Sequence, residues 1–513
     1  MAQTQTIETL LARGSADASA IGATSDPNAT ARPPLTYAGL RDLARATVAD
    51  LNAMGIGRND RVALVLPNGP EAASTFVTVA CAATTAPLNP AYRADEFAFY
   101  LDDLAAKALL IARGMESPAR AVAAERGIPT VEVVPGAAAG GFTLAPEKPL
   151  TGTPARPGMA QPDDIALVLH TSGTTARPKI VPLSQRNITA SAAHIGAALA
   201  LAPDDVCLNI MPLFHIHGLI AAVLSSLSAG ATVVCSPGFN AFRFFSWLGA
   251  VRPSWYTAVP TMHQAILPLA ARNREVIAGG RLRLIRSSSA SLPPPVMEEL
   301  ERTFGVPVIE AYGMTEAAHQ MASNPLPPAA RHAGSVGRAA GPEIGIMDDE
   351  GNLLPPGELG EVVIRGPNVT SGYDNNPDAN ARAFTNGWFR TGDQGTLDAQ
   401  GYLRLTGRLK EIINRGGEKV SPLEVDAVLL DHPAVAQVVT FAMPHDKLGE
   451  EVAAAVVLRE GAALEEAALR DFAAQRLAAF KVPRRILFMP DIPKGATGKL
   501  QRIGLAGKLG LTA

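Results

Sequence analysis

Hydroxyl side chains, a glycine and a lysine are concentrated in one short segment, residues 171–179, which reads TSGTTARPK. A loop of this composition can offer backbone N–H groups, hydroxyls and a cation to a polyphosphate. Its spacing differs from the GxxxxGK[ST] loop of P-loop enzymes, and Ile180 follows Lys179 where that loop has Ser or Thr. The apolar run before it, residues 165–169, predicts a buried strand that positions the loop.

The elements around this loop alternate along the chain between strand-like and helix-like segments. Such an alternation predicts parallel sheets covered by helices, with ligands at the carboxyl ends of the strands. A serine-rich segment, residues 287–291, is expected to form a loop after one of the strands. The predicted strands cover residues 61–66, 255–259, 282–286 and 306–310, and the predicted helices cover 69–83 and 261–271, with another helix starting at 293–295.

Two parts of the chain depart from this alternation. Residues 135–164 are dense in Gly, Pro and Ala, which predicts a connecting loop rather than part of a core. After about Gly345 the pattern changes to short strands with glycine-containing turns, predicted at residues 361–365 and 402–405. The last hundred or so residues predict a compact α+β module with helices at 422–430 and 465–477, and we expect the domain boundary at 407–410.

Composition excludes several classes of protein. A chain of 513 residues is too long for one ordinary core, so we expect two or three domains. The 45 basic and 48 acidic residues give a net charge of −3, without the basic excess typical of nucleic-acid binding. No apolar run approaches the roughly 20 residues that span a bilayer, so we expect no membrane partner. Cys81, Cys207 and Cys235 lack CxxC spacing, which predicts neither a zinc site nor disulfides and favours a cytoplasmic location.

Several further motifs follow the hydroxyl-rich loop. In chain order they are MPLFH at 211–215, EAYGMTE at 310–316, TGD at 391–393, GRLK at 407–410 and PKGATGK at 493–499. Over essentially the whole chain, this series resembles the adenylate-forming superfamily of acyl-CoA synthetases, peptide-synthetase adenylation domains and luciferases. Members of that superfamily make an acyl-adenylate from a carboxylate and ATP, and then transfer the acyl group to a thiol.

The resemblance implies an α/β fold in two domains. A large N-terminal domain of parallel sheets layered with helices, with an added β-subdomain, is expected at residues 1–407, followed by a hinge at 408–410. A small mobile α+β domain is expected at 411–513. Lys410 matches the hinge residue about which that domain rotates between the two half-reactions. The residues expected to line the CoA tunnel after the rotation are Gly416, Gly417 and Glu418.

The resemblance also implies a catalytic lysine and a metal site. A carboxylate and an α-phosphate are both anions, so bringing them together requires cations. Lys499 resembles the family lysine that bridges these two groups. Thr315 and Glu316 resemble the pair that positions Mg²⁺, with Glu316 as the metal ligand, so ATP, Mg²⁺ and CoA are the expected cofactor and co-substrates.

The nucleotide is expected to bind along the motifs, with Tyr312 stacked on adenine and Asp393 and Arg408 on the ribose. Ile180 departs from the family, which usually has glycine there, and we expect it to stiffen the loop without abolishing activity. The residues expected to bind ATP and AMP are Thr171, Ser172, Gly173, Thr174, Thr175, Lys179, Ser289, Ala290, Glu310, Ala311, Tyr312, Asp393 and Arg408.

Within the family, residues 317–327, 365–370 and 416–426 resemble the oxalate–CoA ligase branch. Oxalate keeps a second negative charge beside the reacting carboxylate, and burying that charge requires hydrogen-bond donors or a cation. His215 is also expected to take part in catalysis, because it matches a residue between the acyl site and the thiol tunnel. The residues expected to contact the acid are His215, Ser289, Gly313 and His319.

Three alternatives to an oxalate ligase stay open. The first is a CoA ligase for another small or aromatic acid, such as a 4-coumarate-like substrate. The second is an adenylating protein that loads a separate carrier protein, and the third is a non-enzymatic nucleotide-binding relic. Apart from that carrier protein, the expected partners are small molecules, without nucleic acid or membrane, and the expected assembly is a monomer or homodimer.

Overall fold

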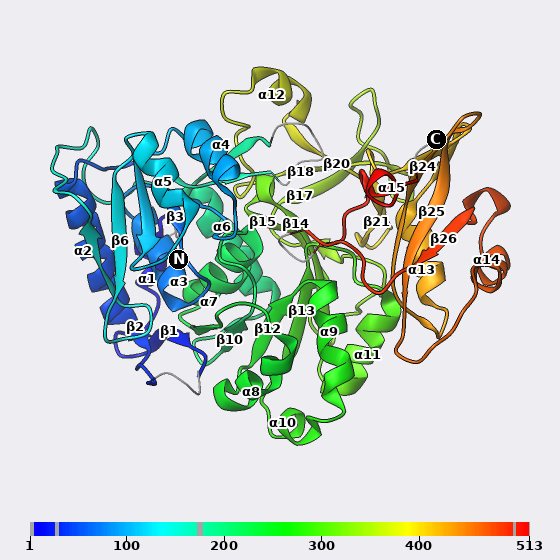
Figure 1. Ribbon diagram of the computed structural model, residues 1–513, viewed down its shortest axis with the longest axis horizontal. Helices are drawn as coiled ribbons and strands as arrows, with labels where there is room; N and C mark the ends of the chain where they lie inside the picture. The colour runs from blue at the N-terminus through cyan, green and yellow to red at the C-terminus, as the bar shows by residue number, and fades with distance from the viewer. Residues whose placement is uncertain (1–4, 26–29, 172–177, 496–498, 512–513) are drawn as a thin grey trace.

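The computed structural model describes residues 5–25, 30–171, 178–495 and 499–511 (Figure 1). The first half of the chain lies at one end of the molecule and the C-terminal sheet at the other, with the middle of the chain between them. Two large mixed sheets with helices form the bulk, a smaller β-sheet extends them, and a compact α+β unit follows. The predicted fold class is therefore confirmed. Across the described ranges, no helix is both long and apolar enough to cross a membrane.

The first large sheet carries the strand before the hydroxyl-rich loop. Its described strands follow the order β7-β6-β5-β3-β4-β8-β9, with parallel pairing in the middle and antiparallel pairing at both edges. These strands are β3 (Arg61–Val65), β4 (Thr84–Pro87), β5 (Ala108–Ala112), β6 (Thr130–Pro135), β7 (Phe142–Pro146), β8 (Ile165–His170) and β9 (Ile180–Ser184).

Strand β7 corrects one prediction, because it lies inside the segment expected to be a connecting loop. It pairs with β6 alone, from Val131 opposite Pro146 to Pro135 opposite Phe142. An edge strand tolerates proline, since one side of its backbone needs no ladder partner. The Gly-, Pro- and Ala-rich surroundings therefore concealed a short edge strand.

The second large sheet carries most of the remaining motifs. Within the described residues its order is β16-β15-β14-β13-β12-β10-β11-β1-β2, parallel from β1 through β14 and antiparallel at β2, β15 and β16. Its strands are β1 (Ser19–Ala23), β2 (Leu35–Thr36), β10 (Val206–Asn209), β11 (Thr232–Cys235), β12 (Trp255–Ala258), β13 (Leu284–Ser288), β14 (Val308–Met314), β15 (His319–Ser323) and β16 (Arg338–Ala339).

Two of these strands extend further toward the C-terminus than predicted. Strand β13 includes Ser287 and Ser288, which were expected in a loop, and β14 continues past Glu310 to Met314. Serine is not a strong strand former, but Ser288 donates its hydroxyl to Ala311 O of β14 at 2.8 Å. This cross-strand bond replaces the packing that an apolar residue would supply and extends the pairing toward the motif residues.

The helices and helical turns cover the faces of these sheets (Figure 1). Several begin at a capping hydroxyl, as at Ser184 and Ser421, which each accept a backbone N–H of the first turn. They are α1 (Ile7–Leu11), α2 (Tyr37–Ala53), α3 (Pro70–Ala80), α4 (Ala94–Leu104), α5 (Pro118–Glu125), α6 (Gln185–Ala198), η1 (His217–Leu224), α7 (Ser225–Ser228), α8 (Ala241–Val251), α9 (Pro260–Ala270), α10 (Arg274–Ala278), α11 (Pro294–Phe304), η2 (Thr315–Ala317), α12 (Pro377–Ala383), α13 (Pro422–Leu430), α14 (Glu466–Ala474), η3 (Ala479–Lys481) and α15 (Leu505–Lys508).

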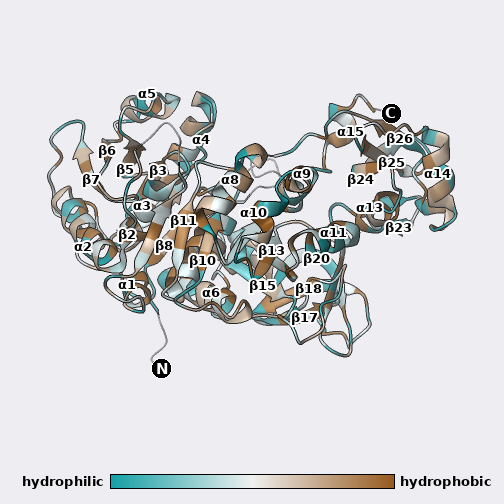
Figure 2. Cartoon of the chain, turned by 90° about the horizontal axis from the view of Figure 1, so that it is seen from below, coloured by the Kyte–Doolittle hydropathy of each residue, from teal (hydrophilic) through white to brown (hydrophobic). Residues whose placement is uncertain are grey.

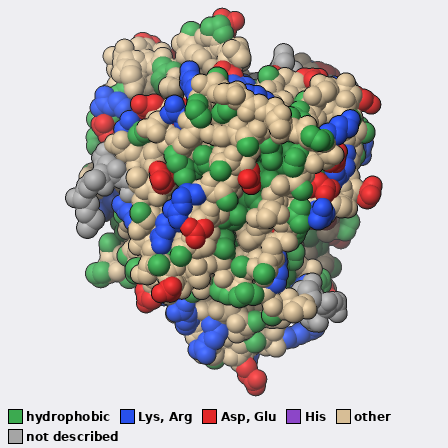
Figure 3. Space-filling model, turned by 90° about the vertical axis from the view of Figure 1, so that its left-hand side faces the viewer, with side chains coloured by type: hydrophobic (Ala, Val, Ile, Leu, Met, Phe, Trp, Pro, Cys, Tyr) green, Lys and Arg blue, Asp and Glu red, His purple; other side chains and the backbone are tan. Residues whose placement is uncertain are grey.

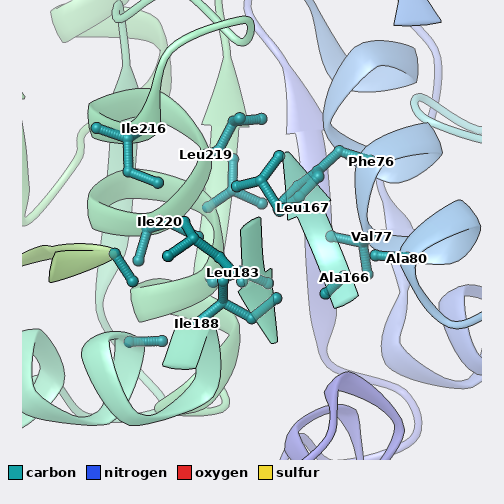
Figure 4. Packing of buried hydrophobic residues seen from close by; sticks show 14 of the residues in the cluster. Phe76, Val77, Ala80, Ala166, Leu167, Leu183, Ile188, Ile216, Leu219 and Ile220 are labelled. Carbon is teal, nitrogen blue, oxygen red and sulfur yellow. The ribbon is translucent and has the colours of Figure 1, made fainter. Parts of the chain in front are cut away.

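The main hydrophobic core lies where α3, α6 and η1 meet strands β8 and β9 (Figure 4). Leu167 of β8 lies between Phe76 of α3 and Leu219 of η1, and all three side chains are buried. Each such side chain contributes about 1.5–3 kcal/mol when it leaves water. Element η1 is a π-helix, a rare form often found at functional sites, and it begins at the buried His217. The core therefore supports the strand before the hydroxyl-rich loop and the start of η1 together.

Two smaller sheets complete the fold, and in Figure 2 they lie on the side of the molecule away from β6 and β7. On the opposite face, shown in Figure 3, basic and acidic side chains are interspersed. The β-subdomain contains β17 (Glu343–Met347), β18 (Gly360–Arg365), β19 (Phe384–Thr385), β20 (Trp388–Leu397) and β21 (Leu403–Arg408). The C-terminal sheet contains β22 (Ile413–Arg415), β23 (Glu418–Val420), β24 (Val435–His445), β25 (Gly449–Leu458) and β26 (Arg485–Phe488).

Candidate functional site

The predicted adenine residue and the two predicted ribose residues meet across two sheets. Tyr312 lies in β14, and its hydroxyl donates to Asp393 Oδ2 of β20. Arg408 of β21 lies opposite Asp393 in the strand pairing, and its Nε is 3.4 Å from Asp393 Oδ1. Burial raises the pKa of Asp393, while the Arg408 charge opposes that shift. A buried carboxylate that is held by a phenol and a guanidinium is a hydrogen-bond acceptor fixed in position, as binding of the two ribose hydroxyls would require.

The base of the predicted phosphate loop is closed by two hydrogen bonds. Thr171 N donates to Lys179 O at 2.9 Å, and Lys179 N donates to the Thr171 hydroxyl at 3.1 Å. These bonds continue the antiparallel pairing of β8 and β9, so the two ends of the loop are held side by side. Four predicted loop residues, Ser172, Gly173, Thr174 and Thr175, lie outside the described residues.

The predicted metal carboxylate lies near the lysine of that loop. Glu316 is in η2, directly after β14, and its Oε1 accepts a hydrogen bond of 2.9 Å from the Tyr373 hydroxyl. Lys179 Nζ lies 4.0 Å from the centre of the Tyr373 ring. Burial raises the pKa of Glu316 and lowers the pKa of Lys179. The chemistry of the site fits Mg²⁺, since the available ligand is a buried carboxylate, an oxygen donor that this hard cation prefers.

Glu310, predicted to bind nucleotide, has a different environment. Its Oε1 accepts a 2.8 Å hydrogen bond from Leu292 N, and Oε2 has no partner among the described residues. Burial raises the pKa of this carboxyl group to about 8, so it is mainly protonated at neutral pH. The side chain thereby holds the chain after Ala290, another predicted nucleotide residue, against β14. Ala311, which was also predicted to bind the nucleotide, accepts a hydrogen bond from the Ser288 hydroxyl at its carbonyl oxygen.

A histidine that the sequence analysis missed lies at the centre of the predicted acyl site. His217 Nδ1 lies 3.0 Å from the Ser289 hydroxyl, and His217 Nε2 lies 2.6 Å from the Thr257 hydroxyl. The predicted His215 precedes it by two residues and accepts a 3.3 Å hydrogen bond from His217 N at Nδ1. The sequence signal was present in the run FHIHG, where a second histidine follows the predicted one.

A second missed residue is Arg286 of β13, which is fully buried. Its guanidinium lies 3.5 Å from His217 Nε2, 3.4 Å from the Thr257 hydroxyl and 3.2 Å from Gln320 Oε1. Burial lowers the pKa of Arg286 to about 9. Within the described ranges no carboxylate pairs with it, so Arg286 is a buried cation whose contacts are all neutral groups.

His319 and Gly313, both predicted to contact the acid, lie together beside this cation. The His319 ring centre is 4.9 Å from that of His217, and neither His319 ring nitrogen has a partner among the described residues. Burial and the Arg286 charge hold the pKa of His319 well below its usual range. A side chain at position 313 would lie 1.8 Å from His319 O, which explains the glycine there.

The backbone around this pocket is strained. His319, Ala318 and Ser289 have φ values of 101°, 47° and 75°, in the left-handed region that residues with a side chain rarely adopt. Such conformations cost about 1–3 kcal/mol each and are concentrated at functional sites. Two of these three residues, Ser289 and His319, are among the four residues predicted to contact the acid, and Ala318 directly precedes His319.

Lys499 approaches both halves of the site from the C-terminal part of the chain. Its charge lowers the pKa of His215, His217 and His319, while Asp393 raises and Arg408 lowers the pKa of Lys499 itself. Burial is the main reason that the pKa of Lys499 falls to about 8. The charge of the predicted lysine therefore acts on both the ribose residues and the histidine cluster.

The predicted hinge and tunnel residues lie in two turns that follow Arg408 in the chain, and the charge of Lys410 adds to burial in lowering the pKa of Lys179. Lys410 is exposed in a turn between β21 and β22, where Leu409 N donates to Gly392 O and Glu411 N to Arg408 O. Gly416 and Gly417 form the turn between β22 and β23 with φ values of 59° and 99°, followed by the exposed Glu418. The predicted Thr315 begins η2 and accepts Ala318 N through its carbonyl.

Comparison with known proteins gives consistent matches over the whole chain. The AMP-binding enzyme family matches residues 13–374, and the AMP-binding enzyme C-terminal domain matches residues 424–499. An oxalate–CoA ligase of Arabidopsis thaliana is 48% identical over 91% of this chain and 92% of its own. An oxalate–CoA ligase of Saccharomyces cerevisiae is 42% identical over 87% of this chain and 86% of its own.

Solved structures agree with these matches. ATP-bound MatB from Rhodopseudomonas palustris has a TM-score of 0.84 and 30% identity, with 97% of each chain covered. The anthranilate CoA ligase AuaEII in complex with anthranoyl-AMP has a TM-score of 0.83 and 25% identity, over 100% of this chain and 98% of its own. The chain belongs to the AMP-binding enzyme family, whose acyl-CoA ligases join carboxylic acids to CoA through an acyl-adenylate at the expense of ATP.

Proposed function

We propose that this protein ligates oxalate to coenzyme A through an oxalyl-adenylate, releasing AMP and pyrophosphate. The observation that carries the proposal is Arg286, a fully buried cation without an anionic partner among the described residues. Burying an unpaired charge is costly, and the usual compensation is an opposite charge at hydrogen-bonding distance. A substrate that brings a second carboxylate would supply that compensation.

Oxalate suits the surroundings of Arg286 because it is short and carries a charge at each end. While one carboxylate reacts, the other lies one bond away and cannot reach solvent. The two ring nitrogens of His319 have no described partner, and the Ser289 hydroxyl and His217 lie on the same side of the pocket. An aromatic acid such as 4-coumarate would instead place an apolar ring against Arg286 and two histidines. This polarity favours oxalate over the 4-coumarate-like alternative, and the two oxalate–CoA ligases among the relatives support it.

In the first half-reaction, an oxalate oxygen attacks the α-phosphorus of ATP, and pyrophosphate leaves with the bonding electrons. Lys499 would neutralise the two approaching anions, since its half-buried ammonium interacts electrostatically with both the ribose residues and the histidine cluster. Asp393 and Arg408 would orient the ribose, and Tyr312 the adenine. The residues that would hold Mg²⁺ are Glu316 and Thr315, and the ion would supply charge neutralisation on the phosphates.

In the second half-reaction, the CoA sulfur attacks the acyl carbon, and AMP leaves with the bonding electrons. We propose that residues 411–513 rotate about residues 408–410 between the steps, relative to the large domain at 1–407. The exposed turn at Lys410 supports a hinge, because few side-chain contacts would have to break there. Gly416, Gly417 and Glu418 would then face the large domain as the CoA tunnel, and His215 would separate the acyl site from it.

We propose a cytoplasmic setting for the enzyme. Cys81, Cys207 and Cys235 are free and buried, which fits a cytoplasmic location. We propose a monomer or homodimer that acts on small molecules.

The test is CoA-dependent AMP formation with ATP and Mg²⁺, comparing oxalate with malonate, glycolate, acetate and 4-coumarate. We expect kcat/KM for oxalate to exceed that for glycolate, acetate and 4-coumarate by at least about 100-fold, as the charge argument below requires, because none of these three acids brings a second carboxylate. High activity with 4-coumarate would overturn the assignment of the acid, and AMP formation with none of the acids would overturn the ligase assignment itself.

A further inference from the structure

Tyr373 lies between two oppositely charged groups of the phosphate side of the site. Its hydroxyl donates to Glu316 Oε1 at 2.9 Å, and the face of its ring carries the Lys179 ammonium at 4.0 Å from the ring centre. Lys179 and Glu316 influence each other electrostatically, but no ion pair joins them in the described part of the chain. Each charge is bound to a different part of one buried aromatic side chain.

The backbone around Tyr373 is fixed to the same strand that follows Lys179. Asp374 N donates to Ile180 O at 3.0 Å, and the Thr370 hydroxyl donates to Pro182 O at 2.7 Å. Asn380 of α12 accepts Tyr373 N at 2.7 Å and donates to Tyr373 O at 2.8 Å. The tyrosine therefore cannot move independently of β9 and α12, and the place of its ring relative to Lys179 is set by the fold.

Without the Tyr373 side chain between them, Lys179 and Glu316 would be expected to form a direct ion pair, because they already interact electrostatically in a partly buried site. That pair would occupy the cation expected to bind the phosphates and the carboxylate expected to bind Mg²⁺. A neutral aromatic residue can bind both at once without joining them, because its face attracts a cation and its hydroxyl donates to an anion.

We propose that Tyr373 is a positioning residue that keeps Lys179 and Glu316 apart, so that both charges stay available to ATP and its metal. Lys179 is then held on the ring face for the β- and γ-phosphates, and Glu316 is held by the hydroxyl for the cation. The proposal rests on the proposed use of ATP, but not on the identity of the acid.

Two substitutions separate the two functions of the side chain. Tyr373→Phe keeps the ring face and removes the hydroxyl, whereas Tyr373→Leu removes both and keeps apolar volume. The readout is the Kd of ATP in EDTA and in Mg²⁺, measured by isothermal titration calorimetry. AMP is the control ligand, because it lacks the β- and γ-phosphates.

In EDTA, we expect Tyr373→Leu to weaken ATP binding about five- to thirty-fold, because the phosphates must then compete with Glu316 for the Lys179 ammonium in a partly buried site. AMP affinity is expected to change by less than about two-fold, since only the phosphate side is disturbed. Tyr373→Phe should leave metal-free ATP binding within about two-fold of wild type and reduce the gain in affinity that Mg²⁺ provides.

A double variant tests whether the weakening comes from a new ion pair. Adding Glu316→Gln to Tyr373→Leu removes the carboxylate that Lys179 would turn to, so metal-free ATP binding should recover to within about two-fold of Glu316→Gln alone. No recovery would overturn the proposal, as would an equal metal-free loss in Tyr373→Phe and Tyr373→Leu, or a parallel loss of AMP binding. If wild type itself fails to bind ATP, the proposed function fails instead, so the two failures are distinguishable.

Discussion

Replacing Arg286 with glutamine should make the protein more stable and at the same time a worse enzyme for oxalate. The guanidinium is fully buried among neutral groups, and burial lowers its pKa from 12.5 to about 9. Since one pKa unit corresponds to about 1.4 kcal/mol, the buried charge costs up to roughly 5 kcal/mol of folding free energy. Arg286→Gln removes that cost and loses hydrogen bonds to Thr257 and Gln320 worth about 1 kcal/mol each. We expect a net gain in unfolding free energy of about 1–3 kcal/mol at pH 7.

The loss of activity follows from the attraction between the guanidinium and the second carboxylate of oxalate. At a separation of about 6 Å and an effective dielectric constant of about 20, this attraction is about 3 kcal/mol. Its removal corresponds to a fall of about 100-fold in kcat/KM for oxalate. Glycolate, which has a hydroxymethyl group in place of the second carboxylate, should lose less than about three-fold, because it has no second charge to stabilise.

The assay compares oxalate and glycolate in wild type, Arg286→Gln and the control Arg286→Lys, which keeps the charge. Urea unfolding of the same preparations gives the stability. An oxalate kcat/KM that stays within about three-fold of wild type, or an equal loss for both acids, would refute the pocket assignment. A destabilised Arg286→Gln would refute the view that this cation lacks compensation in the free protein.

Three further substitutions test other parts of the site. Lys499→Ala should lower the rate of oxalate adenylation by at least about 100-fold, while the rate of thiolation from preformed oxalyl-adenylate stays within about three-fold of wild type. Single-turnover assays measure the two rates, and equal losses in both would contradict a role of Lys499 that is confined to the first step. His319→Ala should raise the KM for oxalate at least about ten-fold and leave the KM for ATP nearly unchanged, because we propose that its unpartnered ring nitrogens bind the acid. Initial-rate kinetics with each substrate varied in turn give the two KM values. Glu310 has a folded-state pKa raised by burial to about 8, so the folded protein retains a proton that the unfolded chain releases, and stability falls as pH rises from about 5 to 8. In urea unfolding at pH 5.5 and pH 8, Glu310→Gln should reduce the decline in unfolding free energy between the two pH values by on the order of 3 kcal/mol. An equal decline in the variant and in wild type would show that Glu310 does not titrate in this range.

The sequence predicted the elements well where a local pattern determines them. Helix α13 has the predicted bounds, and β3 and β12 differ from the prediction by a single residue at one end. These segments combine clear periodicity with strong boundary residues, such as the proline that follows the Ser421 cap. Strand β7 was missed because an edge strand of five residues leaves almost no periodic signal.

The candidate site could be predicted only where a motif names the residue. Tyr312, Asp393 and Arg408 come from three separate motifs, and the structure brings them into contact. Arg286 lies within a run that reads LRLIRSSS, where an arginine ordinarily marks a strand end or an exposed face. Its burial depends on which face of β13 meets η1, and that is decided by long-range packing. Sequence spacing cannot show such a contact.

The cost to stability is not spread evenly through the molecule. The uncompensated cation at Arg286, the unpartnered nitrogens of His319 and the left-handed backbone at Ser289 and Ala318 all lie around the pocket assigned to the acid. Each feature is unfavourable in the free protein, and each would be relieved or used by a small anion with acceptors on both ends. Selection for stability alone would have removed them, since apolar replacements of buried charges are often neutral or stabilising. Their concentration at one place is therefore an argument, independent of any relative, that this pocket binds a charged acid rather than an apolar one.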